Sequence, residues 1–349
     1  MRIDPQRIHD AQSLLARHVG PTRIARAASL SSAGHDVFLK LETDLPTGSF
    51  KVRGAIYSLS VNLAKGAIGE VVCASTGNHG AAVAYAAQIL DVPATIFLPS
   101  APNPVKAARI RALGARIVES GVDISAAIDA AQEYAERAHA FFLHDASDPD
   151  VPVGTATIGM EVVDQLPAVD VIYVPMGDTA LIRGVASAAK QYRRAITIVG
   201  VVAEQAPAYF LSWQKSRTPK GSRLRAPRAS AGQAGLGAGD VVETATCDTI
   251  ADGLAVRRPL APNVAAIRDL VDDVVAVGEQ EMIAAIELLY AREQVIAEPA
   301  GAAATAAFLK LGDLDVGRGL SDPAARTSVV LVTGSNIAPR LRPTRAPRL

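Results

Sequence analysis

The feature with the clearest chemistry is one lysine, Lys51, in the segment LETDLPTGSFKVRGA at residues 41–55. This turn-rich segment presents one amine where an apolar strand pattern passes into a helical pattern. An ammonium held near a helix N-terminus and away from water loses proton affinity, because burial and the positive end of the helix dipole both disfavour its charged form. A neutral amine can form a Schiff base with a carbonyl cofactor. On its own, such a lysine is more often a solvated residue at a helix start.

A second turn with binding chemistry follows the next apolar strand pattern. It has the sequence STGNHG at residues 75–80 and runs into an alanine-rich helical pattern over residues 81–90. Small residues at a helix start let backbone N–H groups converge on a carboxylate or a phosphate without a side chain in the way. We interpret this segment as an anion-binding turn, although an ordinary capped turn would give the same pattern.

Three more motifs follow along the chain: TIADGLAV at residues 249–256, EPAGA at residues 298–302 and TGSN at residues 333–336. With TGSFKVRGA and STGNHG before them, they make the chain resemble the fold-type II pyridoxal-phosphate enzymes, close to the threonine/serine dehydratases and serine racemase. The resemblance covers roughly residues 15–340, and five ordered motifs are far more specific than a lone glycine pattern. It implies pyridoxal 5'-phosphate as the cofactor. It also implies an α/β fold of two open, twisted, mostly parallel α/β/α domains with the active site in the cleft between them.

The elements that must position these motifs are short β-branched strands that alternate with alanine-rich helical patterns. This alternation predicts parallel sheets, in which ligands bind beyond the carboxyl ends of the strands, where each motif lies. A continuous apolar run such as residues 329–332 predicts a strand that helices cover on both faces. The predicted strands are residues 37–41, 71–75, 94–98, 116–118, 171–174, 196–203 and 328–332.

We expect a large cofactor-binding domain made of residues 1–69 and 150–349, and a small domain of residues 70–149. Residues 215–239 are rich in Ser, Gly, Pro, Arg and Lys and show no apolar periodicity, which predicts a long surface loop. The chain ends soon after the last motif. We therefore expect no regulatory domain of the kind that follows the catalytic part of biosynthetic threonine dehydratases, and no allosteric control by isoleucine.

Carried over residue by residue, the resemblance implies roles for five cofactor contacts. Lys51 would be the Schiff-base lysine, while Phe50 and Gly253 would face opposite sides of the cofactor ring. Asn78 matches the residue that hydrogen-bonds the phenolic oxygen, and Thr333 matches the residue whose hydroxyl meets the pyridine nitrogen. A hydroxyl cannot keep that nitrogen protonated as a carboxylate would, so the ring is a weaker electron sink and elimination is favoured over transamination.

The STGNHG turn is implied to hold the substrate carboxylate, through Ser75, Thr76, Gly77, Asn78 and His79. Lys51 would then remove the α-proton, and the β-hydroxyl would depart with a proton from the cofactor phosphate. The aminoacrylate that results hydrolyses to a 2-oxo acid and ammonia. We therefore expect an ammonia-lyase that eliminates water from a β-hydroxy amino acid such as L-threonine or L-serine.

Other functions stay open at the level of the sequence. A β-eliminase or replacement enzyme with an unusual substrate, as in hydroxyectoine degradation or threonine synthase, would share the same style of turn. An inactive relative that only binds an amino acid or the cofactor would also keep these motifs. Formation of a 2-oxo acid from L-threonine or L-serine separates the dehydratase from both.

One motif departs from the family pattern. The phosphate-binding loop is usually four glycines, whereas VPMGDTAL at residues 174–181 keeps only Gly177. Asp178 brings a carboxylate towards a phosphate dianion, which at contact distance costs about 1 kcal/mol in water and more when buried. We expect Asp178 to cap the following helix or to mark an unusual phosphate site, with Arg183 one turn onwards offsetting its charge. The residues assigned to the phosphate, through backbone N–H groups, are Gly177, Thr179 and Ala180. The cofactor-binding set also includes Asp178 and Leu181.

A second departure concerns racemisation and metal binding. Thr76, which we assign as catalytic together with Lys51, matches the serine whose hydroxyl reprotonates the opposite face in racemases of this group. Its β-branch fixes χ1 and crowds the substrate, so we expect weak serine racemase activity at best. The same racemases hold a divalent cation after the strand that here ends at Glu204, but Tyr209 and Phe210 stand where another acid is expected. We therefore assign no metal site.

The amino-acid composition limits the kinds of partner and the cellular compartment that we expect for the protein. The 349 residues carry 35 basic and 35 acidic side chains, with no basic stripe that would favour nucleic acid or an anionic membrane. Cys73 and Cys247 form neither a metal pattern nor a disulfide framework, which predicts a reducing compartment. The N-terminus has no apolar signal core, and no apolar stretch approaches the roughly twenty residues that span a bilayer. We expect a cytoplasmic enzyme with a small amino-acid substrate, homodimeric as its relatives commonly are.

Overall fold

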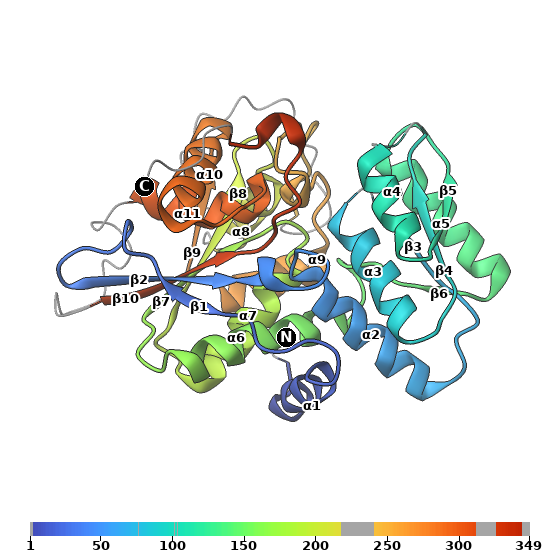
Figure 1. Ribbon diagram of the computed structural model, residues 1–349, viewed down its shortest axis with the longest axis horizontal. Helices are drawn as coiled ribbons and strands as arrows, with labels where there is room; N and C mark the ends of the chain where they lie inside the picture. Colours follow the sequence, from blue (N-terminus) through green and yellow to red (C-terminus); the bar gives the residue numbers. More distant parts are fainter. Residues whose placement is uncertain are drawn as a thin grey trace.

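The computed structural model describes residues 3–75, 77–100, 102, 104–217, 241–311 and 326–343. Its named strands form two sheets, one of six strands and one of four, each with helices on both faces (Figure 1). Short 3-10 helices η1 (Glu42–Asp44), η2 (Asp252–Leu254) and η4 (Pro339–Leu341) lie in the connections. Within the described ranges, none of the helices has the length and apolarity to cross a membrane.

The larger sheet has the strand order β1-β2-β10-β7-β8-β9 and is parallel except for the edge pair of β1 and β2. Along β10, Val329 and Leu331 pack into one apolar cluster and Val330 and Val332 into another. Alternate side chains of a strand point to opposite faces, so helices cover both faces of this strand, as predicted. The strands are β1 (Ile24–Arg26), β2 (His35–Leu41), β7 (Val171–Pro175), β8 (Thr197–Ala203), β9 (Asp273–Val277) and β10 (Arg326–Val332).

Two groups of helices cover the faces of the larger sheet. Helices α10 (Glu279–Glu293) and α11 (Pro299–Leu311) share one apolar cluster with it. The other face packs against α6 (Val151–Gln165), α7 (Ala180–Tyr192), α8 (Ala208–Arg217) and α9 (Ala261–Leu270). Helices α6 and α7 approach closely because Gly159 has no side chain, and a Cβ there would lie 2.5 Å from the carbonyl oxygen of Val185. Helix α1 (Pro5–Leu15) packs on α6.

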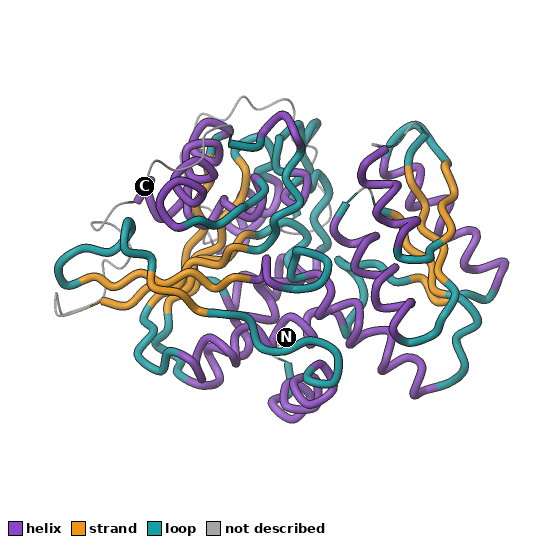
Figure 2. Tube along the Cα trace, viewed as in Figure 1, coloured by secondary structure: helices purple, strands orange, loops and turns teal. Residues whose placement is uncertain are grey.

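The smaller sheet is parallel and has the order β5-β4-β3-β6. Helices α3 (Asn78–Ile89) and α4 (Pro104–Ala112) cover one face, and α5 (Ile124–Ala138) covers the other. Helix α2 (Lys51–Lys65) packs against both α3 and α6, so it connects the helical layers of the two sheets (Figure 2). The strands are β3 (Val71–Ala74), β4 (Ala94–Leu98), β5 (Arg116–Glu119) and β6 (Phe141–Phe142).

All seven predicted strands are present, with ends that differ by up to two residues. Strands β1, β6 and β9 were not predicted, and β1 and β6 are very short. The expected loop at residues 215–239 begins later than predicted, because α8 continues to Arg217, and residues 218–239 lie outside the described ranges. The expected domain boundaries stay a prediction, although all strands of the smaller sheet fall between residues 71 and 142.

Candidate active site

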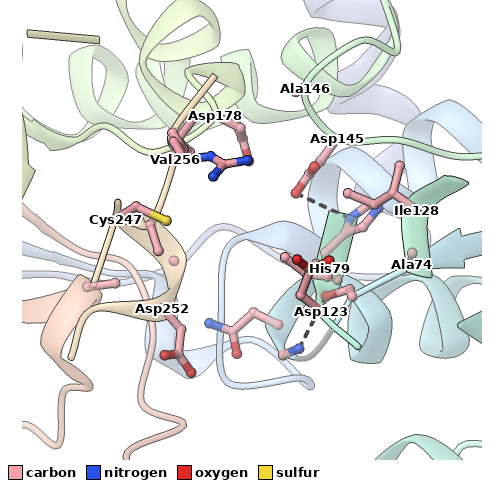
Figure 3. A pocket seen from close by; sticks show the side chains of 18 of the residues that line it. Ala74, His79, Asp123, Ile128, Asp145, Ala146, Asp178, Cys247, Asp252 and Val256 are labelled. Atoms are coloured by element: carbon pink, nitrogen blue, oxygen red, sulfur yellow. Dashed lines mark hydrogen bonds and ion pairs between the residues drawn. The ribbon is translucent and has the colours of Figure 1, made fainter. Parts of the chain in front are cut away.

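A cleft of about 1050 Å³ is lined by loops of both sheets. These loops follow the carboxyl ends of the strands, where parallel sheets bind ligands. Figure 3 shows Asp145 and His79 on one wall and Asp178 and Cys247 on the other. The first wall belongs to the smaller sheet and its connections, and the second to the larger sheet.

The structure brings almost all predicted cofactor residues together in a smaller pocket that shares Lys51, Asn78 and Asp178 with the cleft. Of the predicted set, Ala180 alone does not line this pocket among the described residues, and it is the first residue of α7. The predicted residues that line it are Phe50, Lys51, Asn78, Gly177, Asp178, Thr179, Leu181, Gly253 and Thr333. The predicted substrate residues that line the cleft are Ser75, Gly77, Asn78 and His79. Thr76 lies outside the described residues.

The position of Lys51 is set by the end of strand β10. The backbone N–H of Phe50 donates to the carbonyl oxygen of Thr333 at 3.1 Å, and Ser49 forms an isolated bridge with Gly334. Helix α2 begins directly afterwards at Lys51, as predicted. The Lys51 amine points into the cleft and lies 2.8 Å from Oδ2 of Asp178. This contact holds the amine between the two walls.

A second carboxylate, that of Asp145, also contacts the Lys51 amine. Burial lowers the pKa of Lys51, but Asp145 and Asp178 together outweigh burial and hold this pKa above its ordinary value. The expectation of a weakened proton affinity is therefore wrong for the protein by itself, because two acids surround the amine. Asp145 was missed in the sequence, although the run HDASDPD at residues 144–150 follows β6 at the carboxyl edge of its sheet.

Asn78 joins three of the sequence motifs. Its amide nitrogen donates to Glu298 of EPAGA, and its amide oxygen accepts from Asn336 of TGSN at 2.6 Å. The Asn336 amide also donates to the carbonyl oxygen of Thr47 at 3.0 Å. A side chain bonded at both ends has one orientation, so Asn78 is fixed at the N-terminus of α3 where it faces the cleft.

The 177–181 segment has the features of a phosphate loop despite its missing glycines. The backbone N–H groups of Gly177, Asp178 and Thr179 donate to no acceptor among the described residues. The buried hydroxyl of Thr179 has no partner there either, and Thr179 has a φ of 76°, a strained left-handed conformation for a β-branched residue. Free N–H groups at a helix N-terminus bind anions, so these residues fit the phosphate of the cofactor.

Asp178 precedes the N-cap residue Thr179 and bonds to the first turn of helix α7, which agrees with one of the two predicted alternatives. Its Oδ1 accepts from the backbone N–H of Ala180 at 2.8 Å, while its Oδ2 faces Lys51. Burial lowers the pKa of Arg183, and the nearby Asp178 carboxylate partly opposes this effect. The guanidinium is therefore within electrostatic range of Asp178, and its role in offsetting that charge stays a prediction.

Replacement of Gly177 by alanine is expected to weaken cofactor binding at least tenfold. A Cβ at this position would lie 2.1 Å from the carbonyl oxygen of Gly253, so the phosphate loop and the turn at η2 would have to separate. Cofactor affinity is measured by titrating the apoprotein with pyridoxal phosphate and following absorbance. The matched control is Gly69→Ala, at a glycine outside the left-handed region with nothing within 4 Å of its Cβ position. Unchanged affinity in Gly177→Ala would contradict this role for the contact.

The residues that the sequence analysis considered for a metal site make other contacts in the structure. Glu204 lies 2.9 Å from the Lys310 amine, which also donates to Glu281 and to the carbonyl oxygen of Ala276. The hydroxyl of Tyr209 accepts from the backbone N–H of Leu260 at 3.1 Å, and Phe210 packs against the apolar cluster of the larger sheet. The part of the chain that the structure describes contains no group of three His, Cys, Asp or Glu side chains arranged to hold a metal ion.

Burial of His79 is expected to make the folded protein sensitive to mild acid. Burial lowers the pKa of His79 below its ordinary value of 6.5, more than Asp145 raises it. Below about pH 6.5 the unfolded chain binds a proton at this residue that the folded chain does not bind, so the stability present above this pH is lost as pH falls towards the folded pKa. Urea denaturation should show this loss, and the His79→Gln variant should show a smaller one. Equal losses in both proteins would refute this assignment.

The fold, the cleft and the amine between its walls define an enzyme of the fold-type II pyridoxal-phosphate class. The family described as "Pyridoxal-phosphate dependent enzyme" matches residues 15–334, and the chain belongs to this family. It is 34% identical to the L-threonine ammonia-lyase of Geobacter sulfurreducens over 331 residues, which cover 95% of this chain and 75% of that protein. It is 31% identical to the serine racemase of Oryza sativa subsp. indica over 308 residues, 88% of this chain and 84% of that one. Maize serine racemase superposes with a TM-score of 0.84 at 27% identity, covering 97% of this chain and 95% of the other.

Proposed function

We propose that this protein is an ammonia-lyase that eliminates water from a β-hydroxy amino acid such as L-threonine or L-serine. The products are a 2-oxo acid and ammonia. The observation that carries the proposal is the position of the Lys51 amine, which lies in one cleft with the N-terminus of α3 and beside the phosphate-like loop before α7. The identity to L-threonine ammonia-lyases over 95% of the chain supports the same reaction.

The residues that would hold pyridoxal phosphate come from several of the sequence motifs. Lys51 would bind the aldehyde of the cofactor. The backbone N–H groups of the loop at residues 177–181 would bind its phosphate. Asn78 would contact the phenolic oxygen. The hydroxyl of Thr333 makes only a long contact of 3.5 Å to the carbonyl oxygen of Ala300, so it can still form a hydrogen bond with the ring nitrogen of the cofactor. Phe50 and Gly253 line the same pocket and would enclose the ring.

When bound, the cofactor withdraws electrons from Cα and so makes the α-proton of an amino acid acidic. Lys51 acts as the base that removes this proton, because its amine faces the cleft. The substrate carboxylate binds at the N-terminus of α3, where the positive end of the helix dipole and the small residues Ser75 and Gly77 favour an anion. The aminoacrylate product then reacts with water to give the 2-oxo acid. Thr76 keeps its proposed part in a weak racemisation on the opposite face.

The direct test is to incubate the purified, cofactor-loaded protein with L-threonine and with L-serine. Formation of 2-oxobutanoate or pyruvate together with an equal amount of ammonia is the expected result. Protein that carries the cofactor and yields neither acid would contradict the proposal. Chiral analysis of the remaining serine in the same samples measures the racemase activity.

The proposal also covers the oligomeric state, the cellular compartment, the domain division and the partners of the protein. The resemblance to this family supports a homodimer, which sedimentation velocity would test. Two unpaired cysteines, of which Cys73 is buried, support a cytoplasmic location. The two sheets support the division into a large domain of residues 1–69 and 150–349 and a small one of residues 70–149. The neutral formal charge supports an enzyme without nucleic-acid or membrane partners.

A further inference from the structure

One tyrosine hydroxyl lies at the cleft with two hydrogen-bond donors already on its oxygen. Tyr209, in helix α8, is 2% exposed and lines the cleft. Its hydroxyl oxygen accepts from the backbone N–H of Leu260 at 3.1 Å and from the side-chain amide of Asn263 at 3.3 Å. A phenolic hydroxyl can also donate one hydrogen bond, and that of Tyr209 has no acceptor in the part of the chain that the structure describes. Its hydrogen therefore points away from the two donors, and the side that is left open is the cleft.

The amide of Asn263 places this hydroxyl close to the residues that contact Lys51. Asn263 is 3% exposed, and its amide nitrogen also lies 3.0 Å from the carbonyl oxygen of Ala146 and 3.3 Å from that of Asp178. The carboxylate of Asp178 is 2.8 Å from the Lys51 amine. Asp145, the residue before Ala146, contacts the same amine. Asn263 therefore joins the two walls of the cleft next to the catalytic lysine, and it holds the hydroxyl there.

This hydroxyl is a neutral hydrogen-bond donor. Burial raises the pKa of Tyr209 above its ordinary value, and the hydrogen bonds from Leu260 and Asn263 oppose this effect only in part. The phenol therefore keeps its proton in the folded protein. A fixed neutral donor suits an oxygen on which negative charge develops during a reaction, because the hydrogen bond strengthens as the charge grows and the donor does not have to move.

We propose that Tyr209 donates its hydrogen bond to the β-hydroxyl oxygen of the substrate and thereby makes hydroxyl a better leaving group. The inference rests on the proposed function, in which Lys51 removes the α-proton. Cα then lies next to the Lys51 amine, and the β-hydroxyl oxygen is two bonds from Cα, within reach of a donor beside that amine.

The elimination from serine balances without a proton from Tyr209. The Cα–H bond breaks with transfer of its proton to Lys51, and the Cβ–O bond breaks with its electron pair leaving on oxygen. The oxygen takes up one proton and departs as water, so the sum is serine converted to 2-aminoacrylate and water. Tyr209 stabilises the charge that grows on the oxygen and keeps its own proton.

Two substrates with different leaving groups separate this role from a structural one. L-Serine and β-chloro-L-alanine both give 2-aminoacrylate and hence pyruvate, but chloride leaves as a stable anion and needs little help from a hydrogen-bond donor. In the cofactor-loaded Tyr209→Phe enzyme, kcat/KM from initial rates should fall about 10- to 100-fold for serine and less than about threefold for β-chloroalanine. The control is Tyr57→Phe, at a buried tyrosine in α2 that does not line the cleft, and it should leave the ratio of the two values unchanged.

A binding measurement covers the case in which Tyr209→Phe disturbs the fold, since two buried donors lose their acceptor in this variant. Lys51→Ala protein lacks the base, so serine stays intact in it. L-Serine and L-alanine differ only in the hydroxyl. Serine should therefore raise the melting temperature of cofactor-loaded Lys51→Ala more than an equal concentration of alanine, and the difference should vanish in Lys51→Ala/Tyr209→Phe.

The outcomes distinguish this inference from the proposed function. Equal losses for serine and β-chloroalanine in Tyr209→Phe, or no loss for serine, would overturn the inference and leave the proposed function intact. A difference between serine and alanine that persists in the double variant would do the same. A wild-type enzyme that forms no 2-oxo acid from serine or threonine would overturn both.

Discussion

Replacing Lys51 with alanine is expected to lower kcat for the elimination from L-threonine by more than about 1000-fold. Loss of a positioned general base alone costs about 10²–10⁴ in rate, and here the same residue also anchors the cofactor. Formation of 2-oxobutanoate under saturating cofactor measures the effect. The variant should retain its fold, since the amine lies in a cleft and not in an apolar core.

Lys65→Ala is the matched control for this prediction. Lys65 ends the same helix that Lys51 begins, but its side chain is 62% exposed and its partner Asp150 lies 3.4 Å away. Asp150 is buried but keeps Arg7 as a second partner, and neither lies in the site, so kcat should stay within about twofold of the wild type. A Lys51→Ala protein with near wild-type turnover would remove Lys51 from the reaction.

The second large effect is expected at Arg53, two residues after the catalytic lysine. Its guanidinium is buried and donates to Glu42 at 2.8 Å and to Glu161 at 2.9 Å, while Lys40 donates to Glu161 at 2.6 Å. Arg53→Met leaves two buried carboxylates with one cation. Removing one partner of such a group costs about 3–5 kcal/mol. We expect a fall of this size in the free energy of unfolding, measured by urea denaturation.

Arg23→Met is the control that separates the effect of burial from the effect of ion pairing on the free energy of unfolding. Arg23 also makes two hydrogen bonds to one carboxylate, that of Asp44, at 2.7 and 2.9 Å, but its side chain is 70% exposed. Surface pairs contribute about 0–1 kcal/mol. Similar losses in the two variants would show that the buried network does not hold helix α2 in place.

The sequence predicted the parts of the site that rest on backbone turns. Lys51, the turn before α3 and the residues at the end of β10 have residue types that specify a strand end or a helix start, and parallel strands bring such ends to one edge. The same reasoning placed the continuous apolar strand β10 between two helical layers. These features depend on local geometry and on the pattern of burial, which a single sequence carries.

The electrostatics around Lys51 could not be predicted in the same way. The amine is balanced by Asp145, which is 94 residues away in the sequence, and by Asp178, which is 127 away. A pairing of that kind depends on how the two sheets face each other. The lowering of the Lys51 pKa by burial was foreseen, but the larger effect of two acids from opposite walls was not. Likewise, β9 was missed, although its run DVVAV at residues 273–277 has the β-branched pattern of the predicted strands.

The most direct measurement is borohydride reduction of the cofactor-loaded protein, followed by peptide mass analysis. We expect one pyridoxyl-phosphate adduct, carried by the peptide that contains Lys51 and bonded to the side-chain nitrogen of this lysine. A reduced adduct on a different lysine, or protein that takes up pyridoxal phosphate and yields no adduct after reduction, would contradict it.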